Sequence, residues 1–173
     1  MNPLDTILSW HDQLKENNKI IVHFLQKNPE SFPITAKIGK SFAAKEDEAI
    51  TSLSDLKNEL DDLIIVSLFV TFEQFIIDYI TNTNINTVNQ ETDLFKKEIF
   101  QYCLKDSDKW KFKEILDLFK PIIDPTIIGD IKQIYDYRNW VAHGKRKQKP
   151  INTDPITVHN KLTDFLKRAM IHI

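Results

Sequence analysis

The sequence predicts an all-α protein that folds as a bundle of about five to seven helices. Apolar residues recur at spacings of three and four along most of the chain, and no segment alternates apolar and polar residues as a half-buried strand would. The chain has 173 residues, of which 42% are hydrophobic, so it can bury the core of one compact domain. We therefore expect a single domain over residues 1–173.

Residues 1–50 predict a helical extension at the start of this domain. Asn2 can cap a helix and Pro3 fits its first turn, so the first helix is expected to begin there. Apolar residues at helical spacing continue to about Lys27, and the prolines within 28–33 then interrupt the pattern. Whether the extension regulates a site or completes the bundle stays open at this point.

The core of the domain is expected over 51–173, with its longest helix over about 55–80. Ser54 can cap this helix, and the apolar residues that follow have the helical period. The expected core positions of the helix include Leu56, Leu60, Leu63, Ile64, Val70 and Phe75. The polar run 81–89 then predicts a loop.

The second half of the chain predicts four further helices. Two amphipathic helices are expected over about 91–104 and 108–119. Asp124 and Asp154 are each followed directly by a proline, an arrangement in which Asp caps a helix and Pro takes its first position. Gly144 suits the C-terminal stop of the helix that begins after Asp124.

Composition and charge limit the compartments in which the protein is expected and the partners that it is expected to bind. A net charge of −2 gives the whole chain no general attraction to nucleic acid or membranes, so any such binding has to be local. The single Cys103 excludes an internal disulfide and a multi-cysteine metal site, which fits a reducing cytoplasm. Residues 1–10 lack the basic start of a signal peptide, and the most apolar run, 63–72, is too short to span a bilayer. We expect a cytoplasmic protein with no membrane partner.

No metal or cofactor is expected. Four histidines are scattered along the chain without the paired ligands of a zinc site: His11, His23, His159 and His172. With only 3 glycines, the chain has no glycine-rich phosphate loop.

The most informative stretch is Tyr137–Lys147, at the end of the helix that follows Asp124. Arg138, one of few arginines among 23 basic residues, stands beside Asn139 and five positions before His143. Asn139 and His143 stack on one helix face, whereas Arg138 lies roughly 140° around the helix from His143. Arg138 and His143 can therefore meet through the long Arg side chain, or across a two-fold interface at which each copy supplies half of the site.

These residue types suit chemistry on a phosphodiester. Arg offers a planar fork of donors that matches phosphate, and His is the side chain that titrates near neutrality. RNA supplies its own nucleophile in the 2′-OH, so cleavage requires a proton acceptor and donor and charge stabilisation at the phosphorus, but no metal. His143 suits the proton transfers and Arg138 the charge stabilisation, with Asn139 orienting the substrate or the imidazole.

A plainer interpretation stays open beside this one. An interior Arg138 can pair with a carboxylate such as Glu73 while His143 fills a helix end, and spacing alone favours that interpretation. A basic island follows the motif and consists of Lys145, Arg146, Lys147 and Lys149. Its cations either bind RNA phosphates or form a solvated loop that complements the negative end of the helix dipole.

The segment Arg138–His143 resembles the R-N-x-x-x-H signature of HEPN domains, and the following Gly144 is typical of many of them. A second segment, Leu68–Phe75, is similar to the apolar helix with an x-x-F-E-x-F pattern in abortive-infection-type HEPN proteins. The order of the two segments also matches. The resemblance covers about residues 50–172 and implies a HEPN-like up-and-down helical core.

The resemblance implies a metal-independent endoribonuclease that works as a homodimer, with the motif helices lining a shared cleft. Carried over to this chain, Arg138 and His143 are the catalytic pair, Asn139 is their polar companion, and Glu73 is the acid that orients Arg138 or serves a structural role. Proteins of this kind act as toxins or in antiphage defence, together with an antitoxin or a defence-system partner protein. One toxin subgroup carries a tyrosine where Lys145 stands here, so control through such a tyrosine is not expected.

The leading hypothesis is therefore a HEPN-type ribonuclease whose partner is RNA. The main alternative is a non-catalytic HEPN module that binds RNA or a partner protein. The third is an unrelated helical adaptor in which the motif is coincidental.

Overall fold

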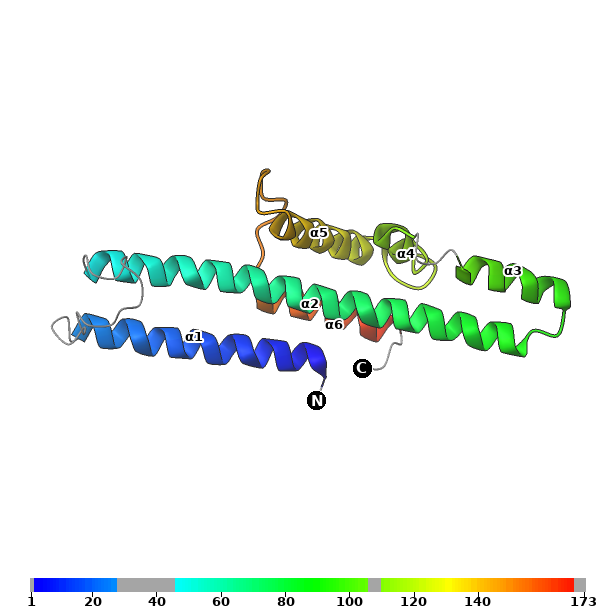
Figure 1. The fold of residues 1–173 in the computed structure, drawn as a ribbon, viewed down its shortest axis with the longest axis horizontal. Helices are drawn as coiled ribbons and strands as arrows, with labels where there is room; N and C mark the ends of the chain where they lie inside the picture. Colours follow the sequence, from blue (N-terminus) through cyan, green and yellow to red (C-terminus); the bar gives the residue numbers. More distant parts are fainter. Residues whose placement is uncertain (1, 28–45, 106–109, 170–173) are drawn as a thin grey trace.

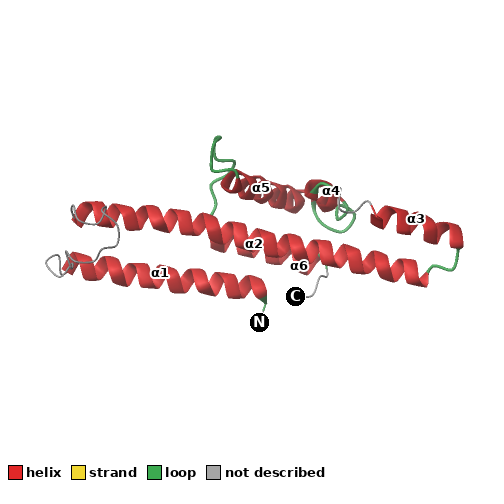
Figure 2. Cartoon of the chain, in the orientation of Figure 1, coloured by secondary structure: helices red, strands yellow, loops and turns green. Residues whose placement is uncertain are grey.

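The computed structural model describes residues 2–27, 46–105 and 110–169. Within these ranges the secondary structure consists of six helices and no strands (Figure 2). The predicted all-α bundle of five to seven helices is therefore confirmed.

Two long helices lie side by side along one edge of the molecule (Figure 1). Helix α1 spans Pro3–Lys27, as predicted, and the side chain of Asn2 accepts a hydrogen bond from the Leu4 N–H at 2.8 Å. Helix α2 spans Glu46–Gln90 and is much longer than predicted. The predicted start at Ser54 was wrong, because this serine lies inside the helix.

The predicted loop over 81–89 was also wrong, since these residues continue α2. The run contains no proline or glycine, so nothing in it forces the helix to stop. The Thr87 hydroxyl donates to the Thr83 carbonyl at 2.9 Å, which satisfies this polar side chain within the helix. Val88 is buried and gives this end of α2 an apolar contact.

Four shorter helices complete the chain and lie close to the predicted ranges. Helix α3 spans Leu94–Lys105 and α4 spans Phe112–Asp117. Helix α5 spans Pro125–Ala142 and α6 spans Pro155–Arg168. Figure 1 shows α5 and α4 lying along one side of α2, with α6 behind it.

The start signals of α5 and α6 are confirmed in atomic detail. The Asp124 carboxylate accepts the Thr126 N–H at 2.7 Å. The Asp154 carboxylate accepts the N–H groups of Ile156 and Thr157, both at 3.0 Å. Hydrogen bonds to Thr126 and to Thr157 lower the pKa values of the two caps, so both stay ionised at neutral pH.

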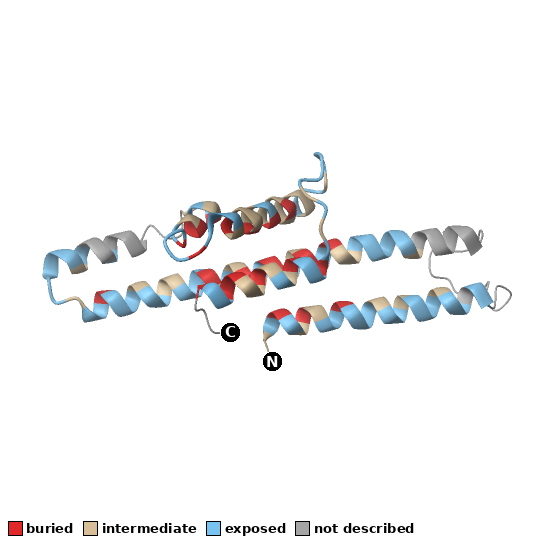
Figure 3. Ribbon diagram, turned by 180° about the vertical axis from the view of Figure 1, so that it is seen from behind, coloured by how far each residue is buried: buried red, intermediate tan, exposed pale blue. Residues whose placement is uncertain are grey.

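The hydrophobic core lies where α2, α5, α6 and the first turns of α1 meet (Figure 3). Its centre is aromatic. The Phe72 ring stands edge-on to Phe165 of α6 with centroids 5.4 Å apart, and Phe69 stands edge-on to Phe112 of α4 at 5.5 Å. Such edge-to-face pairs add to the free energy gained by burying the rings.

A row of apolar side chains on α2 stays exposed, and three of them were wrongly predicted to be core. The row consists of Leu56, Leu63, Val70 and Ile77, which are 61%, 59%, 44% and 39% exposed. Residues spaced by seven share one helix face, and here the buried core already occupies the opposite face. We call these four residues the α2 stripe.

Helix α2 is long and apolar enough, by length and composition alone, to cross a membrane. The segment Leu53–Gln90 has 38 residues. Its most apolar stretch of 18 residues has a mean hydropathy of 1.9, and 33% of that stretch is buried in the protein. The length argument made from 63–72 was therefore wrong, because the helix extends well beyond that run. A central helix of a bundle passes the same test, so the absence of a membrane partner stays a prediction.

Candidate functional site

The motif lies at the C-terminal end of α5 and is anchored to α2 by one buried carboxylate. Asp62 is 8% exposed, in the middle of α2. It accepts a hydrogen bond from the hydroxyl of Tyr137, which is 1% exposed, and it pairs with the Lys145 ammonium at 2.7 Å. Because Tyr137 and Lys145 flank residues 138–144, the backbone of the motif is held at both ends.

The helix end between these anchors has a tight closure. Gly144 has φ +75° and Lys145 has φ +59°, both in the left-handed region. The Lys145 N–H donates to the Trp140 carbonyl and the Gly144 N–H to the Val141 carbonyl, each at 2.9 Å. Two exposed helix carbonyls are thereby satisfied, and glycine meets the backbone requirement at the first position. The predicted stop at Gly144 is confirmed.

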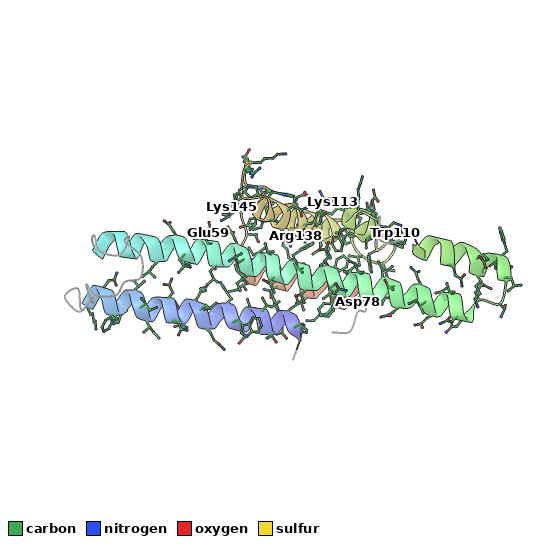
Figure 4. All side chains as sticks on the ribbon, in the orientation of Figure 1. Glu59, Asp78, Trp110, Lys113, Arg138 and Lys145 are labelled. Carbon is green, nitrogen blue, oxygen red and sulfur yellow. The ribbon has the colours of Figure 1, made fainter. Side chains whose placement is uncertain are left out.

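Lys145 was predicted to bind RNA, but its ammonium is already paired. It contacts Asp62 at 2.7 Å and also Glu59, another residue of α2 (Figure 4). Desolvation lowers the pKa of Lys145, but hydrogen bonds to Asp62 and Glu59 outweigh it and raise the pKa overall. The ammonium therefore serves as an anchor between the loop and α2 in this chain. The sequence contained no signal that identified Asp62 as its partner, since Asp62 follows another aspartate directly before the apolar run 63–72.

Arg138 points from α5 toward α2 (Figure 4). Its guanidinium donates to the Asn139 side-chain oxygen at 2.9 Å and lies 3.4 Å from the Glu73 carboxylate. Burial raises the pKa of Glu73, and the nearby Arg138 only partly opposes that rise. The two groups make a single, rather long contact at the edge of the core, and such pairs give little net stabilisation because desolvation offsets their attraction. The guanidinium Nε is buried without a hydrogen-bond partner among the described atoms.

The other motif residues line a groove of about 830 Å³ beside the end of α5. Asn139 and His143 lie on one wall, and Arg146 and Lys147 of the following loop line the groove with them. Arg138 does not line it. The structure thus brings four of the predicted site residues together and leaves Arg138 and Glu73 in the neighbouring seam between α5 and α2. The last residue of the basic island, Lys149, lies over the Tyr137 ring at 5.3 Å from its centroid.

Trp140 supplies an aromatic wall to the same groove. Its indole N–H donates to the Lys147 carbonyl at 2.6 Å, which fixes the ring and the loop relative to each other. The ring also packs against Tyr137 with centroids 5.5 Å apart. The Trp140 side chain is half-buried, so one part packs against the core and another faces the groove.

The groove wall of α5 and the α2 stripe face the same side of the bundle. Asp130 of α5 forms an ion pair with α6 at 2.9 Å, and Asn139 follows it by nine residues, roughly half a turn away around the helix. Phe72 of α2 packs on α6, and Leu63 precedes it by the same nine residues. Asn139 and the stripe therefore both point away from α6, the helix that lies behind α2 in Figure 1.

Comparisons with known proteins do not identify a family: no protein-family model, curated protein or solved structure matches the chain. The resemblance to HEPN domains therefore rests on the two short segments alone and stays a prediction. Among the described residues no group of His, Cys, Asp and Glu is arranged to hold a metal ion. The side chain of Cys103 is not among those that the structure describes.

We predict that Tyr137→Phe lowers the free energy of unfolding by about 1.5–3 kcal/mol at pH 7, because it removes a buried hydrogen bond to a charged acceptor. Burial, followed by the hydrogen bond to Asp62, raises the pKa of Tyr137 above its ordinary value. The folded state therefore keeps this proton at a pH where the unfolded state loses it. The stabilisation is complete below about pH 10 and is lost as the pH rises further.

Urea unfolding at pH 7 and at pH 10.5 checks both parts of this prediction. Tyr79→Phe is the matched control, since its ring is partly exposed and its hydroxyl has no described hydrogen-bond partner. The difference in the free energy of unfolding between the wild type and Tyr137→Phe should be smaller at pH 10.5 than at pH 7. An equal difference at the two pH values, or a difference no larger than the one between the wild type and Tyr79→Phe, would contradict a stabilising hydrogen bond between Tyr137 and Asp62.

Proposed function

We propose that the protein is a metal-independent endoribonuclease of the HEPN type, which cleaves RNA by attack of the 2′-OH on the adjacent phosphate. The observation that carries the proposal is the groove: His143 and Asn139 line it together with Arg146 and Lys147, two cations that form no ion pair within the described part of the chain. These are the groups that hold a phosphodiester and move its protons. A role as a toxin or antiphage-defence effector in the cytoplasm, with an antitoxin or defence partner, rests on the resemblance.

His143 is the residue that we assign to proton transfer. It follows the last residue of α5, its side chain is exposed to the groove, and its imidazole has no hydrogen-bond partner among the described residues. The imidazole is therefore free to accept the 2′-OH proton or to donate a proton to the leaving 5′ oxygen. Asn139 is one turn earlier on the same face and can orient the phosphate or the ring.

Arg138 is the residue that we assign to charge stabilisation, acting from a second copy of the chain. It lies outside the groove of its own chain, and its single contact with Glu73, at 3.4 Å, can be replaced by the shorter bidentate contacts that a phosphate offers. The exposed α2 stripe lies on the side of the bundle to which the groove wall turns. A two-fold dimer through this side would cover the stripe and bring two motif helices around one cleft.

The main alternative is a module that binds RNA or a protein without cleaving it. Two observations favour it: Arg138 already contacts a carboxylate of its own chain, and Lys145 is fully paired with Glu59 and Asp62. Such a module would bind RNA through Arg146 and Lys147 alone. Its binding would then be insensitive to loss of the His143 imidazole.

We predict that His143→Ala and Arg138→Ala each lower the rate of RNA cleavage at least about a hundredfold, measured in excess chelator. Product ends from the wild type should be 2′,3′-cyclic phosphates, because the 2′-OH is the nucleophile. His23→Ala and Arg168→Ala are matched controls on exposed parts of α1 and α6. RNA binding with no cleavage by any variant or the wild type would refute the enzyme and leave the binding module.

We also predict that Leu63→Glu weakens dimerisation at least about tenfold, because it would place a charge in an apolar interface. Ile20→Glu is the matched control, since Ile20 is 63% exposed on α1 and Leu63 is 59% exposed on α2. Sedimentation velocity gives the dissociation constants, and cleavage should fall together with the dimer fraction. A wild type that stays monomeric at concentrations where it cleaves RNA would exclude the shared cleft.

A further inference from the structure

The groove beside α5 has features that the cleavage step itself does not use. Cleavage requires a base, a charge and an orienting group, all of them close to one phosphate. The groove is larger than that: its volume of about 830 Å³ lies within the range of about 300–1,000 Å³ typical of sites that hold a whole small molecule. It also has an aromatic wall, Trp140, and apolar lining from Ala142 and Pro150.

We propose that this groove is a binding site for one complete nucleotide, with the base against Trp140 and the phosphate on Arg146 and Lys147. The inference rests on the proposed function in taking RNA as the natural ligand. It goes further by assigning the groove to a single nucleotide next to the scissile phosphate. It also predicts that the free nucleoside monophosphate binds without any cleavage.

Charge supports the phosphate end of the site. Arg146 and Lys147 line the groove and form no ion pair with any described residue. The one carboxylate on the groove, Asp136, is already paired with Lys113 of α4 at 2.6 Å. The groove therefore has net positive charge even though the whole chain carries −2. Arginine and lysine in such a setting attract a phosphate.

Donors and an aromatic surface support the base end. The Asn139 side-chain oxygen is occupied by Arg138 at 2.9 Å, so its amide N–H groups are the ones left for a ligand. An amide donor pairs with the ring nitrogens and carbonyl oxygens of a base edge. The Trp140 ring is held by the bond from its N–H to the Lys147 carbonyl, so the aromatic wall and the phosphate-binding loop are fixed together.

Fluorescence of Trp140 tests the proposal directly. The variant Trp10→Phe/Trp110→Phe leaves Trp140 as the one tryptophan, because the chain has three in all. This protein is titrated with AMP, GMP, CMP and UMP, and with ribose 5-phosphate as the ligand that lacks a base. Saturation-transfer NMR on the same ligands detects binding that leaves the Trp140 emission unchanged.

We expect saturable binding of at least one nucleoside monophosphate and at least tenfold weaker binding of ribose 5-phosphate. Arg146→Ala/Lys147→Ala should weaken nucleotide binding by about tenfold or more, since charge-assisted contacts are lost. The control Lys96→Ala, on the exposed surface of α3, should change nothing. Equal binding of ribose 5-phosphate would reduce the groove to a phosphate site and overturn the proposal, as would no binding by either method.

Two further outcomes distinguish the nucleotide site from a contact with a second chain and from the proposed cleavage activity. If nucleotide binding is lost as the protein concentration is raised and dimers form, a second chain occupies the groove and the nucleotide site is refuted. An RNA cleavage assay on the same protein is scored independently. Nucleotide binding without cleavage would support the nucleotide site and refute the proposed ribonuclease activity. Cleavage without nucleotide binding would support the ribonuclease activity and refute the nucleotide site.

Discussion

The carboxylate of Asp62 holds the C-terminal end of α5 on α2, and the arrangement of the site depends on it. A buried carboxylate is costly unless it has partners, and Asp62 has two: the Tyr137 hydroxyl and the Lys145 ammonium. These partners lie on either side of the motif in the sequence. The loop that follows cannot shift along α2 without breaking one of these bonds. Arg146, Lys147 and Trp140 are thus placed around the groove by contacts beneath it.

The anchored helix end separates the motif residues into two places. Arg138 lies in the seam with α2, next to Glu73, while Asn139 and His143 face the groove. This separation follows from helical geometry, since adjacent residues differ by about 100° around the axis. A site that uses both Arg138 and His143 therefore has to bring them together from different chains or through a large movement of Arg138. The exposed α2 stripe on the same side of the bundle favours the first solution.

Local signals in the sequence predicted the parts of the structure that are decided locally. The pairs of Asp124 and Asp154 with their following prolines gave the starts of α5 and α6, because capping acts within one turn. The left-handed Gly144 gave the end of α5 for the same reason. The prediction of a loop over 81–89 was wrong because the low helix propensity of these residues was taken as the end of a helix, although none of them prevents helix formation.

Long-range features were not predictable in the same way. Leu63 and Val70 have the period of a core face, yet the helices that pack on α2 cover a different face and leave these residues exposed. Lys145 stood in a basic island that suggested RNA binding, and its partner Asp62 lies 83 positions earlier in the sequence. The groove itself forms from α5 and its following loop, and four of its lining residues were among the predicted site residues. Its separation from Arg138 was only partly foreseen.

Complementation between two inactive chains tests the shared site most directly. Arg138→Ala and His143→Ala proteins are mixed, unfolded together, refolded and assayed for RNA cleavage. In a mixed dimer, the chain that keeps His143 meets the chain that keeps Arg138, so one of the two sites is intact. With random pairing, the mixture should recover roughly a quarter of the wild-type activity. A mixture as inactive as its two components, although shown to contain mixed dimers, would contradict the shared site.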